Sequence, residues 1–338
     1  MKTLLLTWWT WYIGSHNAVL FIEKWYDVII LDNLSNSSES VIKSIWIITW
    51  KTPKFYNWDI RNVSDIEDVF LENKIDAVIH FAGLKAVWES CEKPFDYYEN
   101  NVIWTMNLIK IMEQYNCKNM IFSSSATVYD PGQKPPFSEN TLTGNTTNPY
   151  GTSKFIIENI LRDLANHKNL RVINLRYFNP VGAHRSGLIW ENPNDIPNNL
   201  LPYIMKVASW ELCSLSVYWN DYDTIDGTWV RDYIHVEDLA AGHLASIKYL
   251  FSLETNWIFE VFNLGTGNGT SVIEMIHITE EIIWMPLQYK LSKRRIGDIA
   301  SAYCTPKKAE SILGWKAKKT VKEAISDSWN FITTNTWK

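Results

Sequence analysis

Short apolar runs alternate with helical segments through the first half of the chain, and this alternation constrains the fold more than any other feature. The runs are unbroken and rich in Val, Ile, Leu and Phe, which is typical of strands buried on both faces. Strands that alternate with helices form a parallel, doubly wound α/β sheet, whose ligands bind beyond the carboxyl ends of the strands. We expect strands at residues 3–6, 28–31, 77–81, 120–124 and 172–177, and helices at 64–73, 98–114 and 150–165, with Ser64 and Glu67 forming a capping box.

The second half of the chain has a looser pattern. From about residue 181, loops around 192–199 and 220–227 separate shorter elements, including a strand at 215–218. No Pro/Gly/Ser-rich linker divides the 338 residues, so we expect one body with two lobes.

Charge and cysteine usage limit the classes of partner. The net charge is −5 and the basic residues are scattered, which argues against a nucleic acid or an anionic membrane as the partner. No run reaches the roughly 20 apolar residues of a membrane span. The four cysteines lie far apart, which predicts a reducing, cytoplasmic compartment; they are Cys91, Cys117, Cys213 and Cys304.

The segment after the first strand occupies the place of a phosphate-binding turn. In dinucleotide-binding folds, a glycine-rich turn leads there into a helix whose N-terminus receives the pyrophosphate. Here the segment reads TWWTWYIGSH, and Gly14 is its one glycine. Asp32 follows the second strand about 20 residues later, where a carboxylate accepts the ribose hydroxyls of NAD and disfavours NADP.

A serine run and a Tyr-x-x-x-Lys pair form the candidate catalytic group. Ser123 to Ser125 close the fourth expected strand, and Tyr150 and Lys154 lie four residues apart at a helix start. Residues at this spacing share one helix face, so we expect the Lys154 ammonium to lower the pKa of the Tyr150 phenol. The tyrosinate could then remove a proton from a sugar hydroxyl.

These motifs, in this order over nearly the whole chain, resemble the UDP-glucose (UDP-galactose) 4-epimerase family of extended short-chain dehydrogenases/reductases. WWTWYIGS is similar to the family fingerprint GGTGYIGS, and RYFNPVGA and VRDYIHVEDLA match later family segments. The resemblance implies inversion at C4 of a UDP-sugar through a 4-ketosugar, with tightly bound NAD taking and returning hydride. It also implies a Rossmann-type NAD-binding domain at 1–180, a nucleotide-sugar lobe at 181–338 interleaved with it near 235–265, and a homodimer.

The resemblance also assigns site residues. It implies that Tyr150 is the acid/base, Lys154 its electrostatic partner and Ser125 an assisting hydroxyl. The implied cofactor contacts are Trp8, Trp11, Tyr12, Ile13, Gly14, Asp32, Asn33, Asp59, Ile60, Phe81, Ala82, Gly83, Lys85, Asn100, Tyr150, Lys154 and Tyr177. The implied substrate contacts are Ser125, Phe178, Asn179, Asn199, Leu200, Tyr218, Arg231, Arg295, Asp298 and Ala302, the last of which leaves room for an N-acetyl group at C2.

Tryptophan is in excess and glycine is scarce. The chain has 18 Trp and 14 Gly, whereas average glycine usage of about 7% would give roughly 24. The family carries glycine in the segments that here contain Trp8, Trp9, Trp11, Trp25, Trp58, Trp88, Trp104, Trp219 and Trp229, while Trp315 and Trp329 match family tryptophans. We hypothesise that the gene uses UGA as a glycine codon and was translated with tryptophan; UGG at these positions would exclude this. The chain as printed should then bind NAD badly and fold poorly, because indoles fill the space that a phosphate turn leaves open.

Two other functions fit parts of the pattern. A nucleotide-sugar 4,6-dehydratase shares the fold but needs an additional Asp-Glu acid/base pair, and the corresponding residues here are Ala126 and Thr127. A non-catalytic dinucleotide sensor would suit a turn blocked by tryptophan, although it would have no use for the Ser125, Tyr150 and Lys154 set.

Overall fold

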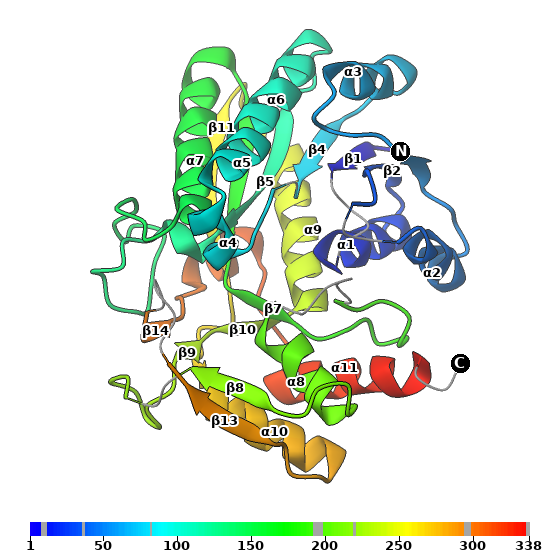
Figure 1. Cartoon of the computed structure of the whole chain (residues 1–338). Coiled ribbons are helices and arrows are strands. Elements are labelled where there is room, and N and C mark those ends of the chain that lie inside the picture. The colour runs from blue at the N-terminus through cyan, green and yellow to red at the C-terminus, as the bar shows by residue number, and fades with distance from the viewer. Residues whose placement is uncertain are drawn as a thin grey trace.

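The computed structural model describes residues 1–7, 12–35, 38–81, 83–191, 199–218, 221–293 and 299–335 (Figure 1). A central sheet of seven strands has the order β11-β6-β5-β4-β1-β2-β3, and all its pairings are parallel. Its strands are β1 (Thr3–Thr7), β2 (Asp27–Leu31), β3 (Lys54–Tyr56), β4 (Ala77–His80), β5 (Asn119–Ser125), β6 (Arg171–Tyr177) and β11 (Ile258–Leu264). The predicted doubly wound parallel sheet is confirmed.

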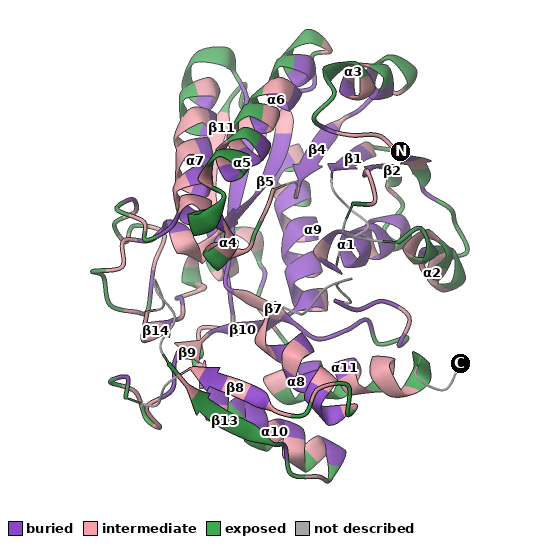
Figure 2. Cartoon of the chain, viewed as in Figure 1, coloured by how far each residue is buried: buried purple, intermediate pink, exposed green. Residues whose placement is uncertain are grey.

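Helices cover both faces of this sheet (Figure 1). On one face pack α1 (Tyr12–Glu23), α2 (Ser40–Thr49) and α9 (Val236–Ser252); on the other pack α3 (Val63–Glu72), α6 (Trp104–Gln114) and α7 (Pro149–Lys168). Because side chains alternate along a strand, Leu4 and Leu6 join the first of these cores and Leu5 joins the second. Figure 2 shows the central strands and much of α9 as buried.

The second lobe is built on a separate apolar core. Its helices are α8 (Leu200–Ala208), α10 (Val272–Ile283) and α11 (Val321–Asn335), which pack beside the parallel pair β8 (Leu215–Tyr218) and β13 (Tyr289–Ser292). Short strands connect the lobes: β7 (Asn179–Val181) pairs with β10 (Tyr233–His235), and β9 (Val230–Arg231) lies between β12 (Thr270–Ser271) and β14 (Ser301–Ala302). None of the helices within the described ranges is long and apolar enough to cross a membrane.

Two predictions of local structure need correction. The residue that caps α3 is Asn62, whose side chain accepts a hydrogen bond from the Ser64 backbone at 3.2 Å, so the proposed capping box of Ser64 and Glu67 is wrong. The helix predicted at 98–114 is interrupted: α5 (Pro94–Tyr98) leads through a π-helical turn (Glu99–Ile103) into α6.

Four tryptophans adopt the left-handed backbone conformation. Trp25, Trp50, Trp210 and Trp284 have φ angles of 66°, 56°, 66° and 57°. Each follows the end of a helix, where the left-handed residue is usually glycine because a Cβ atom is strained there. Their side chains are strongly exposed, so packing of the indoles does not explain their presence. Sequence comparison with the family had singled out Trp25 among these four, and the structure adds the other three.

Candidate functional site

The predicted site residues gather at the carboxyl edge of the central sheet. The strand order reverses between β1 and β4, which is where parallel sheets of this kind bind ligands. Ser125 and Tyr177 end the neighbouring strands β5 and β6 and are register partners. Asp32 and Phe81 directly follow β2 and β4.

Ser125 and α7 form the catalytic part of this edge. Asn148 caps α7 by accepting a hydrogen bond from the Gly151 backbone at 2.8 Å. A Cβ atom on Gly151 would lie 2.8 Å from the Thr127 carbonyl oxygen, so glycine allows the start of α7 to approach the end of β5. Ser125 Oγ accepts hydrogen bonds from the Thr127 backbone at 3.2 Å and from Thr127 Oγ1 at 3.0 Å. Its own proton is therefore directed elsewhere, and the Ser125 side chain acts to lower the pKa of the Tyr150 phenol.

The protonation states at this site differ from the prediction. Burial raises the pKa of Tyr150, and the hydrogen bond with Ser125 opposes the rise only in part. The predicted lowering of the Tyr150 pKa by Lys154 is therefore wrong for this structure, in which Lys154 Nζ donates to the Ser123 carbonyl oxygen at 2.8 Å. Burial lowers the pKa of Lys154 to about 7, against the opposing charge of Glu158. Removing a charged amine from water outweighs the attraction to a carboxylate already held by Arg176 at 2.6 Å.

Residues predicted to bind the adenosine half lie at the ends of β2 and β3. Asp32 is buried and accepts a hydrogen bond from the Leu34 backbone at 2.7 Å. Asn33 Nδ2 donates to Asp59 Oδ2 at 2.9 Å, so these two predicted residues are in direct contact. Ile60 is buried beside them. Burial raises the pKa of Asp59, but hydrogen bonds from Arg61 and Asn33 lower it by more, so the pKa is below its ordinary value.

The segment after β4 runs alongside α7. A Cβ atom on Gly83 would lie 3.1 Å from Asn101 Oδ1 and 3.2 Å from Lys154 Nζ, so a larger residue would crowd both side chains. Asn101 accepts from the Leu84 backbone at 2.7 Å and donates to Ser153 Oγ at 3.0 Å. Asn100 is buried and donates to the Asn101 side chain. Asn101 was not predicted as a site residue, because the family pattern pointed to its neighbour Asn100. The fold shows that Asn101 is the residue that bridges the segment after β4 and α7.

The Tyr177 hydroxyl is hydrogen-bonded to His243, a residue of α9. His243 Nδ1 lies 2.9 Å from the Leu239 carbonyl oxygen and must carry the proton of that bond, so Nε2 accepts the hydrogen bond from the Tyr177 hydroxyl. The Phe81 ring packs against the same histidine with 5.1 Å between ring centroids. Two predicted cofactor residues, Phe81 and Tyr177, therefore both contact the buried His243. No motif in the sequence marked His243 as a site residue.

The first turn of α1 contains the described part of the phosphate-binding turn. Tyr12 and Gly14 are buried, and Ile13 packs partly against two of the apolar cores. The Tyr12 hydroxyl donates to the Gly182 carbonyl oxygen at 2.7 Å, which connects this helix to the end of β7.

Residues predicted to hold the UDP-sugar lie on short strands near this edge. Arg231 in β9 is the register partner of Ala302 in β14. Ala302 and Phe178 belong to the same buried apolar cluster. The Asn179 backbone donates to the Asp232 carbonyl oxygen at 2.9 Å, which aligns β7 beside the Arg231 segment. The Arg231 guanidinium lies over the Trp229 ring at 4.7 Å, so one of the suspect tryptophans contacts a predicted phosphate ligand.

Asn199 and a carboxylate that was not predicted connect the two lobes. Asn199 is the N-cap residue of α8, and Leu200 is the first residue of that helix. Asn199 Nδ2 donates to Glu191 Oε1 at 2.6 Å, and Lys85 Nζ lies 3.0 Å from the same oxygen. Tyr218 ends β8 and is half-buried. Glu191 lies in the segment LIWENPND, whose pattern gives no signal for a buried carboxylate.

Five predicted site residues lie outside the described residues. They are Trp8, Trp11, Ala82, Arg295 and Asp298. Among the described residues no group of three or more His, Cys, Asp or Glu side chains could hold a metal ion.

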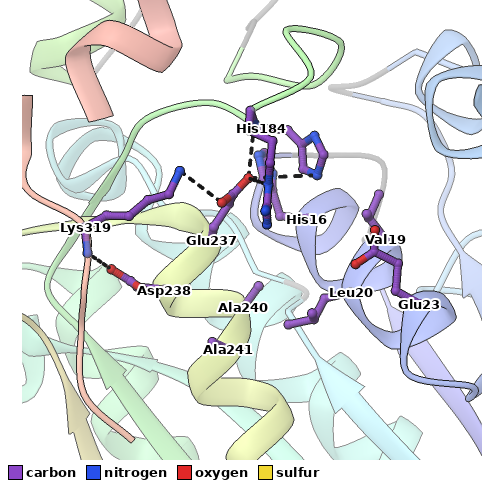
Figure 3. A pocket seen from close by; sticks show the side chains of 11 residues that line it. His16, Val19, Leu20, Glu23, His184, Glu237, Asp238, Ala240, Ala241 and Lys319 are labelled. Carbon is purple, nitrogen blue, oxygen red and sulfur yellow. Dashed lines mark hydrogen bonds and ion pairs between the residues drawn. The ribbon is translucent and has the colours of Figure 1, made fainter. Parts of the chain in front are cut away.

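A cavity of about 200 Å³ lies between α1 and α9 (Figure 3). Glu237 occupies its centre, with Lys319 Nζ at 3.0 Å and Arg185 Nε at 3.1 Å. His184 and the buried His16 also line the cavity, and none of the predicted site residues does. We call five of the lining residues the α1–α9 seam: His16, His184, Arg185, Glu237 and Lys319.

The described residues fit NAD. A carboxylate after β2 suits the adenosine ribose, and a glycine after β4 leaves room that a Cβ atom would fill beside Lys154. Tyr150, Lys154 and Ser125 lie at the same edge of the sheet, where the nicotinamide end would meet a substrate.

Comparison with known proteins agrees with this geometry. The sequence profile of the NAD dependent epimerase/dehydratase family matches residues 6–265. The UDP-glucose 4-epimerase of Haemophilus influenzae is 49% identical over 98% of each chain, and that of Bacillus subtilis is 47% identical over 98% of this chain and 97% of the relative. The crystal structure of UDP-glucose 4-epimerase from Bifidobacterium longum in complex with NAD+ and UDP is 49% identical, covers 99% of both chains and has a TM-score of 0.95. The resemblance stated from the motifs is confirmed, and the chain belongs to the NAD-dependent epimerase/dehydratase family, in which it groups with the UDP-glucose 4-epimerases.

Proposed function

We propose that the protein interconverts UDP-glucose and UDP-galactose by inversion at C4 of the sugar, through a transient 4-ketosugar, with NAD as its cofactor. The observation that carries the proposal is the grouping of Ser125, Tyr150 and Lys154 at the carboxyl edge of the central sheet. The relatives of the chain are UDP-glucose 4-epimerases. The crystal structure of the Bifidobacterium longum relative is in complex with NAD+ and UDP, which supports NAD and a UDP-sugar as the ligands of this chain.

The roles of the three residues follow from their contacts. Ser125 Oγ is fixed by Thr127 and can donate its proton to the sugar O4 or to Tyr150. Tyr150, as the tyrosinate, would take the O4 proton when the ketone forms and return it when the alcohol is restored. Lys154 donates here to the Ser123 carbonyl oxygen, so it would have to turn toward the phenol to stabilise the tyrosinate. Its lowered pKa lets it lose or gain a proton near neutral pH. Bound NAD supplies the hydride acceptor, since no side chain can accept hydride.

We propose the following assignments for the cofactor. Asp32, Asn33, Asp59 and Ile60 would hold the adenosine half, and Phe81, Gly83, Lys85, Asn100 and Tyr177 the nicotinamide half. The segment from Trp8 to Gly14 would carry the pyrophosphate once glycine replaces the tryptophans. For the substrate, Asn179, Asn199, Arg231, Arg295 and Asp298 would hold the UDP group, with Phe178, Leu200, Tyr218 and Ala302 around it.

The alternative functions have less support. A 4,6-dehydratase would need a carboxylic acid just after Ser125, but Ala126 and Thr127 stand there, and the Thr127 hydroxyl donates to Ser125. A non-catalytic sensor would have no use for Ser125, Tyr150 and Lys154 at one edge of the sheet.

We also propose that UDP-N-acetylhexosamines are accepted. The small side chain of Ala302 lies beside Phe178 in one cluster, and a larger residue there would fill the space for a C2 substituent. Turnover of UDP-glucose without turnover of UDP-N-acetylglucosamine would exclude this extension.

The organisation of the chain belongs to the same proposal. We propose that residues 1–180 form the NAD-binding domain and 181–338 the nucleotide-sugar lobe, interleaved near 235–265. The insertion of β11 beside β6 supports this interleaving. The free cysteines support a reducing, cytoplasmic setting, and we propose a homodimer that pairs through the helices at 98–114 and 150–165.

The experiment is a coupled assay of UDP-galactose conversion to UDP-glucose. It compares the printed chain with a version in which glycine replaces the tryptophans at 8, 9, 11, 25, 58, 88, 104, 219 and 229. We expect activity in the restored protein and little in the printed chain, and Tyr150→Phe in the restored protein should reduce kcat by about 10²–10⁴-fold. A restored protein that folds, binds NAD and leaves UDP-galactose unchanged would overturn the proposal.

A further inference from the structure

Glu191 is a buried carboxylate that receives two hydrogen bonds on one oxygen. Its side chain is 5% exposed, and Oε1 accepts from Lys85 Nζ at 3.0 Å and from Asn199 Nδ2 at 2.6 Å. A buried carboxylate destabilises the fold unless it is paired and hydrogen-bonded. Lys85 lies 106 residues away in the sequence and Asn199 only eight, so Glu191 joins its own neighbourhood, at the start of α8, to the segment after β4.

The two partners belong to different halves of the proposed site. Lys85 follows β4 in the central sheet, and its neighbour Leu84 is fixed by Asn101. Asn199 begins α8 in the second lobe. The Glu191 charge also acts on a third segment, because after burial it is the next cause of the raised pKa of Tyr12 at the start of α1.

We propose that Glu191 is a positioning residue that joins the cofactor half to the nucleotide-sugar half, holding Lys85 beside the cofactor and Asn199 where the UDP group binds. The inference rests on the proposed function, because the roles of Lys85 and Asn199 are part of it. Among the described residues, Glu191 bonds to Lys85 and Asn199 rather than to Ser125, Tyr150 or Lys154, so we expect its loss to weaken substrate binding and to leave the chemical step largely intact.

The main variant is Glu191→Gln, which keeps the shape and one amide oxygen but removes the charge that holds Lys85. Its control is Glu260→Gln, which breaks the ion pair of Glu260 with Lys308 at 2.6 Å on β11. Both variants are made in the glycine-restored protein. The measurements are kcat and KM for UDP-galactose, the Kd of UDP by calorimetry and the melting temperature.

We expect Glu191→Gln to raise both the KM for UDP-galactose and the Kd of UDP about tenfold, the effect of a lost charged hydrogen bond, with kcat changed less than threefold. Glu260→Gln should leave KM and Kd unchanged at a similar melting temperature. If Glu191 acts through Lys85, the same substitution in a Lys85→Met background should raise KM by a clearly smaller factor.

Three results would overturn the inference: unchanged KM and Kd in Glu191→Gln, a loss confined to kcat, or fully additive effects with Lys85→Met. If the restored parent does not convert UDP-galactose, the proposed function fails. The UDP titration of Glu191→Gln against its parent then still decides for or against Glu191.

Discussion

At the scale of single residues, the protonation of Lys154 gives a pH-dependent prediction. Its pKa is lowered to about 7 by burial, so between pH 7 and about 10.4 the unfolded chain binds more protons than the folded protein. Stability from this group therefore rises with pH in that window and is lowest at pH 7 and below. We expect the free energy of unfolding of the parent, relative to Lys154→Met, to rise by about 1–3 kcal/mol between pH 7 and 9. Urea unfolding at both pH values measures it. An unchanged difference would show that Lys154 titrates normally, and the variant should in either case be inactive.

Trp229 gives the second prediction at this scale. Its ring lies 4.7 Å from the Arg231 guanidinium carbon, and we infer that this cation–π contact competes with binding of a diphosphate by the same guanidinium. Such contacts stabilise by about 0.5–2 kcal/mol, so adding Trp229→Gly to a protein in which the other suspect tryptophans are already glycine should lower the KM for UDP-galactose by about 2–10-fold at similar kcat. The matched control is Trp284→Gly, which removes an exposed indole at the end of α10. A higher KM in Trp229→Gly, with the control unchanged, would mean that the indole supports Arg231.

The residues that sequence reasoning located are those tied to a strand end or a helix start. Ser125 and Tyr150 could be placed because the end of a parallel strand and the next helix must meet at one edge of the sheet. Glu191, Asn101 and His243 could not be placed, because each acts through contacts with distant segments and lies in no recognisable pattern. The pKa of Tyr150 was predicted wrongly for a related reason: the spacing of Tyr150 and Lys154 is local, whereas burial is a property of the whole site.

At the scale of elements, the helix ends test the tryptophan hypothesis. Trp25 donates to Ile22 and Tyr26 donates to Phe21, the paired backbone hydrogen bonds of a helix end that normally has glycine at the position of Trp25. Trp210 and Trp284 have the same left-handed backbone and are 78% and 91% exposed. Each of Trp210→Gly and Trp284→Gly should therefore stabilise the protein by about 1 kcal/mol. Trp257 is also exposed but has no positive φ, so Trp257→Gly is the control and should give no gain. Thermal unfolding compares them, and a loss of stability at both capping positions would count against glycine as the natural residue.

The α1–α9 seam gives a prediction about acid. Burial raises the pKa of Glu237, but hydrogen bonds from the Arg185 backbone and Lys319 outweigh burial and lower this pKa to about 2 (Figure 3). Because this pKa is depressed, the stabilisation is present above about pH 4.5 and is lost as the pH falls toward 2. We expect Glu237→Gln to destabilise by about 1–3 kcal/mol at pH 7 and by progressively less below pH 4.5. Glu281, paired with Lys322 on the surface, provides the control, since Glu281→Gln should have almost no effect at any pH. A penalty for Glu237→Gln that stays constant down to pH 3 would contradict the assignment.

The elements that could be predicted are those with a long apolar run. The five expected strands are present with bounds that differ by one or two residues. β3 has three residues, which is too short to give a pattern, and β11 has Glu260 and Asn263 within its seven residues. Neither strand was therefore predicted. The capping box failed because Asn62, two residues before Ser64, offers its side chain at the position where the helix begins.

At the scale of the whole molecule, the order of strands and helices was sufficient for the doubly wound sheet, because parallel strands need a crossover helix on one face or the other. The second lobe could not be drawn in advance. Its strands β9, β12 and β14 have two residues each, and β9 pairs with β12 across about 40 positions of the sequence and with β14 across 71, which no local pattern encodes.

The surface over α4 (Val87–Glu92), α5 and α6 gives the last prediction. Phe95 is 86% exposed, and Ile103 and Met106 lie exposed on the same run of helices, which packs against α7. Exposed apolar side chains gathered on one face are typical of a surface that another copy covers. We expect light scattering to give a mass of twice 39.4 kDa for the glycine-restored protein and a monomer for its Phe95→Glu variant, because a charge would then be buried without a partner. Ile225 is 87% exposed in the other lobe, so Ile225→Glu is the matched control and should remain a dimer. A monomeric parent, or a dimer that Phe95→Glu leaves intact, would exclude this face as the subunit interface.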